Sequence, residues 1–118
     1  MPGISIHVMD VSRGVPCEGM EVALYSLDTL NQPQLIVKGR VSHSGALDSP
    51  KLGITFLSGR YRAEFQIGRF YRSAKVPLPQ MPFIDVVSFD FGIDDPQQHF
   101  HLPMKCTPWG YSCFRGGA

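Results

Sequence analysis

The 118-residue chain lacks long apolar runs and basic clusters and has only three cysteines, and each shortage removes a class of protein. No run approaches the roughly 20 apolar residues that a membrane-crossing helix needs. A net charge of +1 without a run of Lys or Arg argues against a nucleic-acid-binding surface. Three cysteines at irregular spacing make a poor disulfide framework and fit a reducing compartment. We therefore expect neither a membrane nor a nucleic acid as partner.

Targeting and cofactor signals are also missing. The segment Met1–Ile4 carries no basic region and opens no apolar stretch, as a secretory signal would. The ending Gly116–Ala118 is no peroxisomal address. Phosphate-binding loops, dinucleotide fingerprints, nucleophile elbows and paired-cysteine zinc knuckles are all lacking. By elimination we expect a cytoplasmic protein, and no motif predicts a metal centre.

What the chain does contain is short alternating runs separated by 12 glycines and 10 prolines, a pattern typical of an all-β sandwich or barrel. The expected strands cover residues 4–10, 20–25, 34–37, a short segment after Gly45, 60–67, 84–91, 99–104 and 109–115. Residues 68–73 are long enough for one or two helical turns. With no repeat or linker, residues 1–118 are predicted to form a single domain of about eight strands and at most one short helix.

Three of the four histidines fall on faces that the alternation leaves out of the core. In the run 99–104, a period of two sends Phe100 inward and places His99 and His101 together on the opposite face. His7 lies opposite Ile6 and Val8 by the same reasoning. Neutral imidazoles gathered on one face serve as general bases or as metal ligands, or they are simply solvated polar residues. The residues alone leave these uses open.

Both ends of the chain resemble the transthyretin-like hydroxyisourate hydrolases. His7–Asp10 followed by Arg13–Pro16 is similar to that family's opening, in which a histidine, an aliphatic pair and an aspartate precede an Arg-Gly-x-Pro turn. His99–Pro103 and Pro108–Gly116 are similar to its closing signature, His-Tyr-His-Val-Pro and Tyr-Ser-Thr-Tyr-Arg-Gly-Ser. The resemblance covers essentially the whole chain, and its most specific part is the C-terminal motif.

The resemblance implies a transthyretin-like β-sandwich of two four-stranded sheets with one short helix. It also implies a homotetramer, a dimer of dimers with active sites in the channel between the dimers. The reaction would be hydrolytic opening of the 5-hydroxyisourate ring in urate degradation, without a cofactor. Transthyretin shares the fold but lacks the catalytic histidines, so His7, His99 and His101 place this chain with the enzymes.

Three positions depart from the family pattern. Alignment on Gly45 puts Ala46 where the family has an arginine that holds the anionic substrate, and Phe114 and Gly117 replace a tyrosine and a serine. Losing a charged hydrogen bond at a desolvated site costs about 2–4 kcal/mol, or roughly 30- to 1000-fold in rate. Arg40, just upstream, is a candidate substitute, although a solvated strand residue is the simpler interpretation. Otherwise the substrate differs or the activity is weak.

The sequence thus predicts general-base hydrolysis of a cyclic amide. His101 or His7 would take a proton from water, and a second histidine or Arg115 would stabilise the oxyanion. The expected substrate-binding residues are Arg40, Ala46, Ser112, Phe114 and Arg115, with Phe114 on the same face as Ser112. The alternatives are an enzyme for another small heterocycle, a non-catalytic small-molecule binder and a histidine-based metal-binding protein.

Overall fold

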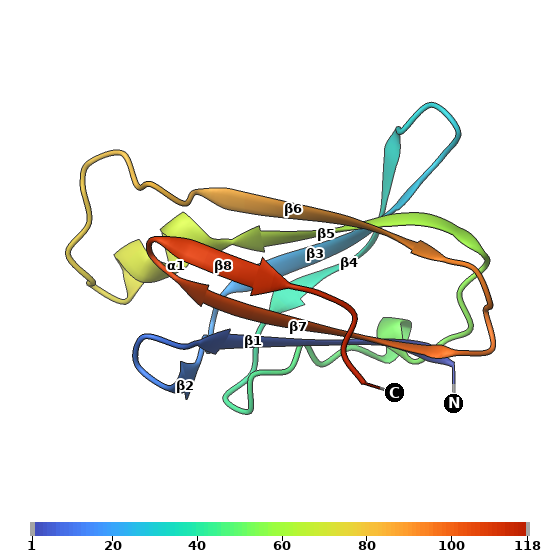
Figure 1. The fold of residues 1–118 in the computed structure, drawn as a ribbon, viewed down its shortest axis with the longest axis horizontal. Coiled ribbons are helices and arrows are strands. Elements are labelled where there is room, and N and C mark those ends of the chain that lie inside the picture. The colour runs from blue at the N-terminus through green and yellow to red at the C-terminus, as the bar shows by residue number, and fades with distance from the viewer. Residues whose placement is uncertain (1, 118) are drawn as a thin grey trace.

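A computed structural model describes residues 2–117. Over these residues the chain forms eight strands, one α-helix and one 3-10 helix (Figure 1). The strands are β1 (Gly3–Asp10), β2 (Val15–Pro16), β3 (Glu21–Leu27), β4 (Pro33–Arg40), β5 (Gly59–Gln66), β6 (Val86–Ile93), β7 (His99–Thr107) and β8 (Gly110–Cys113). The helices are η1 (Pro50–Leu52) and α1 (Ile67–Ser73).

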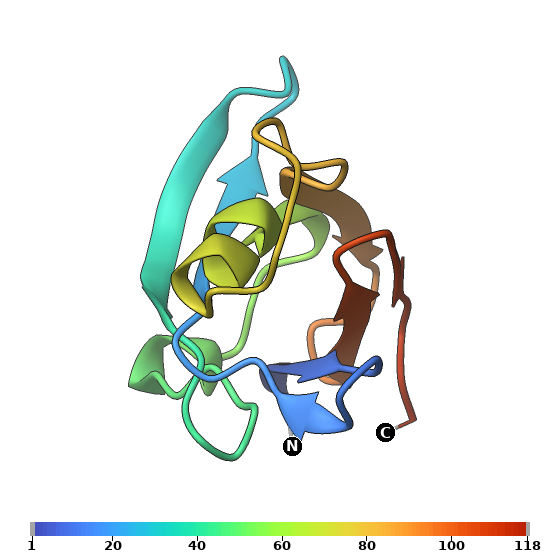
Figure 2. The same cartoon turned by 90° about the vertical axis from the view of Figure 1, so that its left-hand side faces the viewer.

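The strands form two four-stranded sheets that pack face to face (Figures 1 and 2). One sheet has the order β2-β1-β7-β8, and the other has the order β4-β3-β5-β6. The central pair β1 and β7 is parallel, whereas every other neighbouring pair is antiparallel. The expected two-sheet β-sandwich with one short helix is confirmed.

The core lies between the sheets because each inner strand alternates apolar and polar residues. On β1 the inward residues Ile4, Ile6 and Val8 are at most 3% exposed. On β7 the inward set consists of Phe100, Leu102, Met104 and Cys106. Since the period of two fixes both faces at once, burying these residues turns the intervening polar side chains of β1 and β7 outward.

Helix α1 lies across one end of the sandwich (Figure 2). It covers the segment 68–73 that the sequence predicted, and it starts one residue earlier because Ile67 leaves strand geometry. Its buried Tyr71 reaches between the sheets. Within residues 2–117, no helix has both the length and the apolarity needed to cross a bilayer.

The segment that follows Gly45 differs from the prediction. No strand forms there; Ala46 makes one isolated bridge to His7, and η1 follows. Proline at the first position of η1 favours a helical turn, and the Ser49 side chain accepts a hydrogen bond from the amide of Lys51. The eighth strand is instead β2, at the end of the turn expected over residues 13–16, where it pairs with the end of β1.

Candidate active site

The parallel register of β1 and β7 gathers the three histidines on the outward face of their sheet. Ser5 pairs with His101 and His7 pairs with Pro103. The rings of His7 and His101 approach edge to face, with centroids 5.4 Å apart. His99 precedes His101 by two residues and shares its face, as the sequence predicted. The three imidazoles therefore form one half-buried cluster, called here the histidine face.

Ser5 connects two of these rings. Its Oγ lies 2.7 Å from Nδ1 of His101 and 2.9 Å from Nε2 of His99. Sequence reasoning missed this residue, although the alternation of β1 already placed it on the same face as His7. The signal was a short hydroxyl side chain two residues before a histidine, opposite another histidine across the strand pair.

The surroundings of His101 favour its neutral form. Burial lowers its pKa, and the nearby His7 and His99 lower it further because their charged forms repel an imidazolium. The contact with Ser5 acts in the opposite direction but does not reverse the shift. A neutral imidazole retains a nitrogen lone pair that can accept a proton from water.

His7 lies beside Ala46, the position at which the sequence analysis expected an arginine. The turn before it is held by hydrogen bonds from the Val8 amide to the Gly45 carbonyl (2.8 Å) and from the Leu47 amide to the Ile6 carbonyl (3.0 Å). Gly45 adopts φ +94, which favours glycine, and the following Ala46 bridges to His7. Nδ1 of His7 is buried and has no hydrogen-bond partner among residues 2–117.

The C-terminal tail, residues 114–117, contacts His101 through Gly116. The amide of Gly116 donates to the His101 carbonyl at 2.8 Å, and a Cβ added to Gly116 would lie 2.7 Å from Cδ2 of that ring. Only glycine fits this approach without displacing the imidazole. Phe114 lies just after β8, which ends at Cys113 and is shorter than the strand expected over residues 109–115. Its ring is 43% exposed and lies below the ammonium of Lys105 at 5.8 Å. Ser112 pairs with the same lysine across β7 and β8.

The two candidate arginines lie elsewhere in the chain. Arg115 stacks its guanidinium on the inward ring of Phe100 at 4.1 Å and donates to the His99 carbonyl and to Gln98. Arg40 donates to the Gly19 carbonyl at 3.1 Å and lines a hollow beside α1. Neither guanidinium contacts an imidazole ring of the histidine face, so a role for either would require a side-chain movement or a second chain.

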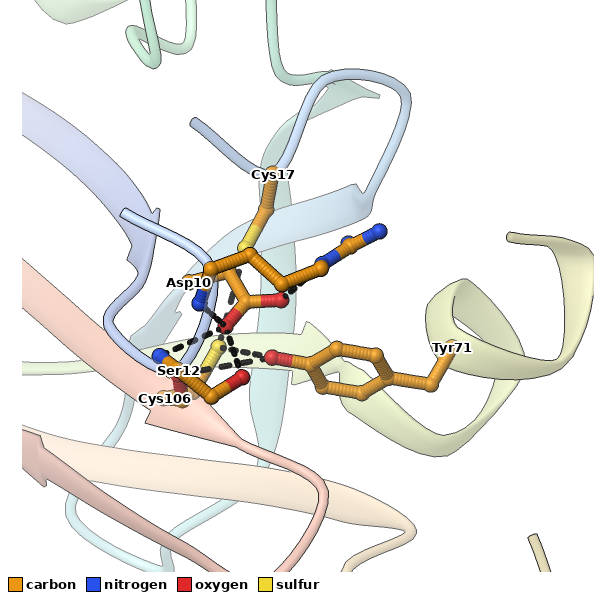
Figure 3. Close-up of polar contacts among 6 residues, drawn as sticks. Asp10, Ser12, Cys17, Tyr71 and Cys106 are labelled. Carbon is orange, nitrogen blue, oxygen red and sulfur yellow. Dashed lines mark hydrogen bonds and ion pairs between the residues drawn. The ribbon is translucent and has the colours of Figure 1, made fainter. Parts of the chain in front are cut away.

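A second polar cluster closes the inner end of β1 (Figure 3). The Asp10 carboxylate is fully buried and accepts hydrogen bonds from the amide and hydroxyl of Ser12 and from the amide and side chain of Arg13. Burial acts to raise the Asp10 pKa, but these hydrogen bonds outweigh it and the pKa is lowered. These four hydrogen bonds all come from the turn after β1, which indicates a structural role.

Two thiols and Tyr71 complete this inner cluster. Sγ of Cys17 lies 3.7 Å from Sγ of Cys106, and the Tyr71 hydroxyl donates to the Cys106 carbonyl at 3.3 Å (Figure 3). The contact with Cys106, together with burial, raises the pKa of the Cys17 thiol. Both thiols are free and fully buried, so they behave as small packing residues. Across residues 2–117, no three His, Cys, Asp or Glu side chains are grouped so as to hold a metal ion.

Fold and site together define a two-sheet β-sandwich that carries a half-buried histidine cluster on one outer face. The chain matches the HIUase/Transthyretin family over residues 4–116, and it belongs to that family.

Known relatives match it over nearly their whole length. The 5-hydroxyisourate hydrolase of Ralstonia nicotianae is 36% identical over 118 residues, covering 98% of this chain and 99% of its own. That of Pseudomonas aeruginosa is 36% identical over 117 residues, covering 98% and 92%.

Two solved structures are similar in fold. One is the 5-hydroxyisourate hydrolase of Klebsiella pneumoniae, with a TM-score of 0.80 and 26% identity, covering 99% of this chain and all of that one. The other is an (S)-allantoin synthase, with a TM-score of 0.88 and 30% identity over 98% of this chain. The present chain spans only 43% of that synthase chain.

Proposed function

We propose that this protein is a hydrolase that opens the ring of 5-hydroxyisourate in purine degradation. The observation that carries the proposal is the histidine face, in which His101 lies against His7, has a lowered pKa, and is held by Ser5 and by the Gly116 amide. The relatives named as 5-hydroxyisourate hydrolases supply the substrate. No cofactor takes part in the proposed reaction.

In the proposed mechanism His101 is the general base. It removes a proton from water as the oxygen attacks a ring carbonyl carbon, and the resulting oxyanion is stabilised by a hydrogen bond from His7. The C–N bond of the ring then breaks, and the departing nitrogen takes the proton from the imidazolium. His101 is preferred to His7 as base because its pKa is lowered and both its ring and its backbone are held by neighbours.

The anionic part of the substrate would bind without the family arginine. Ala46 bridges to His7 and supplies no charge there, and Phe114 and Ser112 lie next to Lys105. Lys105 is exposed on this face and supplies a positive charge there. Arg40 and Arg115 remain the other candidates, each after leaving its present contacts.

We also propose a cytoplasmic homotetramer built as a dimer of dimers. The histidine face is only half-buried in one chain, and the ring of Phe114, which is 43% exposed, lies beside Lys105 on the same sheet. Covering this face with a second dimer would exclude water from the imidazoles, and Phe114 would narrow the resulting channel. Light scattering at micromolar concentration tests this: a persistent monomer with full activity would contradict the shared channel.

The absence of arginine at Ala46 favours one alternative, an enzyme for another, less anionic heterocycle. A non-catalytic binder is the remaining possibility in the family. The deciding experiment adds purified protein to freshly generated 5-hydroxyisourate and follows the loss of its absorbance against spontaneous decay. Acceleration that is proportional to protein concentration supports the proposal. If decay is unchanged while a heterocycle binds, the binder is favoured.

A further inference from the structure

We propose that Ser5 is a positioning residue, whose hydroxyl joins His99 and His101 into a proton relay and sets which nitrogen of His101 carries a proton. The inference rests on the proposed hydrolysis for its catalytic meaning. Its structural content, the linkage of two imidazoles through one serine, stands on the contacts of the chain itself.

The geometry leaves the hydroxyl little choice of partner. Ser5 lies directly opposite His101 in the parallel register, and His99 is the next outward residue on the same strand. The Oγ lies within hydrogen-bond distance of a ring nitrogen of each, at 2.7 and 2.9 Å. A serine side chain has only one torsion angle before its oxygen, so a rigid strand holds that oxygen between the rings.

The donors and acceptors of His101, Ser5 and His99 can form a chain of two hydrogen bonds that point in the same direction. A hydroxyl has one proton to donate, and a neutral imidazole has one N–H and one lone pair. In one arrangement Nδ1–H of His101 donates to Oγ of Ser5, and the hydroxyl proton is donated to Nε2 of His99. This leaves Nε2 of His101 unprotonated, as a general base requires. In the reverse arrangement both hydrogen bonds persist with their directions exchanged, and Nε2 of His101 carries the proton, as a general acid requires.

The catalytic cycle can pass through both arrangements with every proton accounted for. Water gives a proton to Nε2 of His101 while its oxygen bonds to the carbonyl carbon. The Nδ1 proton of His101 moves to Ser5, and the hydroxyl proton of Ser5 moves to Nε2 of His99. The positive charge then resides on His99, and His101 is neutral with Nε2 protonated. When the ring C–N bond breaks, that proton goes to the nitrogen and the relay runs back to its starting state.

The relay answers a difficulty posed by the surroundings of His101. Burial and two neighbouring imidazoles lower the pKa of this ring, so an imidazolium there is unfavourable. The titratable groups facing it are His7 and His99, and Lys105 lies further along the same face. Passing the charge to His99 removes it from contact with His7 at the moment when the oxyanion forms.

The test measures tautomers and kinetics in the full chain. Long-range proton–nitrogen NMR on uniformly 15N-labelled protein reports which ring nitrogens are protonated. At neutral pH we expect wild-type His101 to be protonated on Nδ1. Ser5→Ala should shift His101 towards the Nε2–H tautomer that a solvent-exposed histidine side chain prefers, and it should change the His99 signals as well.

Kinetics on 5-hydroxyisourate supply the second readout. Ser5→Ala should lower kcat by about 10- to 100-fold and leave KM within about twofold, since a relay acts on proton transfer and not on binding. Ser5→Thr, which keeps the hydroxyl on a residue suited to strands, should restore most of kcat. Ser88→Ala, on the exposed face of β6, is the matched control and should leave kcat unchanged.

The two failures are distinguishable. If wild-type His101 is protonated on Nε2 only at neutral pH, the relay is wrong whatever the activity. It is equally wrong if Ser5→Ala folds and the signals of His99 and His101 do not respond. If the tautomers respond as expected but 5-hydroxyisourate is not turned over, the linkage stands and the proposed substrate is wrong. Loss of kcat in Ser5→Thr equal to that in Ser5→Ala would also overturn the relay. The wild-type spectrum decides the point even if Ser5→Ala fails to fold.

Discussion

Strands β1 and β7 carry two polar clusters that face opposite ways. On the inner side, Asp10 is fully buried and its two carboxylate oxygens accept four hydrogen bonds from Ser12 and Arg13. On the outer side, the histidine face is half-buried, Ser5 links two rings, and Nδ1 of His7 has no partner among residues 2–117.

This contrast indicates that the inner cluster around Asp10 stabilises the fold, whereas the histidine face carries the chemistry. Buried polar groups whose bonds are all made hold a turn in place and have nothing left to offer a substrate. On the histidine face, Nδ1 of His7 has no partner among residues 2–117 and His101 has a lowered pKa. A substrate or a second chain can hydrogen-bond to these groups. Changes at the inner cluster should therefore reduce stability, and changes at the histidine face should reduce activity.

The largest expected effect is on activity. His101→Ala should reduce kcat/KM on 5-hydroxyisourate by about 10²- to 10⁴-fold, because general-base catalysis of the water is lost. The half-exposed ring contributes little to the core, so the thermal midpoint should change by only a few degrees. Stopped-flow absorbance and thermal circular dichroism measure both quantities. A variant that unfolds but retains specific activity would reverse the comparison.

Asp10→Ala should have the complementary effect. Leaving Arg13 and the turn amides without their acceptor should lower the free energy of unfolding by about 3 kcal/mol, measured by urea denaturation. Folded protein should retain kcat within about threefold.

The pH dependence of stability follows from the same carboxylate. Its folded pKa is lowered, so its contribution is complete above the ordinary aspartate pKa and is lost as the pH falls through the lower folded value. In acid, wild-type protein should therefore lose stability more steeply than Asp10→Ala. Parallel pH curves would contradict this assignment.

Gly116→Ala sharpens the comparison with one methyl group. The added Cβ would meet Cδ2 of His101 at 2.7 Å, so the ring or the tail must move. We expect kcat to fall by about tenfold or more, since small displacements of a catalytic group are costly, with little change in stability. Gly110→Ala on β8, where a Cβ meets nothing within 4 Å, is the control and should be active.

The smallest effects concern the missing arginine. Arg40→Ala should change kcat/KM by less than about twofold, because the side chain bonds to Gly19 and contacts none of the histidines. Ala46→Arg should raise activity on 5-hydroxyisourate by a few-fold, since a guanidinium beside His7 would bind the anion. A fall of about 100-fold for Arg40→Ala would show that Arg40 serves the site in the assembled protein.

The sequence patterns predicted strand positions and side-chain directions correctly where burial of one face determines them. The alternation in 99–104 placed His99 and His101 outward because an opposite register would have exposed Phe100 and Leu102. The pattern could not give the parallel pairing of β1 with β7, which joins residues 94 or more apart and alone brings Ser5 to the histidines.

Other features depend on contacts that no local pattern encodes. The stretch after Gly45 bridges to His7 without forming a strand, and Arg115 turns onto Phe100 and away from the imidazoles. The sequence showed Gly116 only as part of the C-terminal motif. The structure shows why the position requires glycine, because a Cβ there would meet the His101 ring. Side-chain direction in a tail is set by tertiary packing, which the sequence alone leaves undetermined.

The pH dependence of kcat/KM on freshly generated 5-hydroxyisourate tests the central claim, a neutral His101 acting as the base, most directly. The pKa of His101 is lowered, so the base form persists below the ordinary imidazole value. We predict a rate that stays level from pH 8 to about 6.5 and falls only in more acidic solution. A rate that already declines with a midpoint at or above pH 6.5, or one that is unchanged in His101→Ala, would contradict the account.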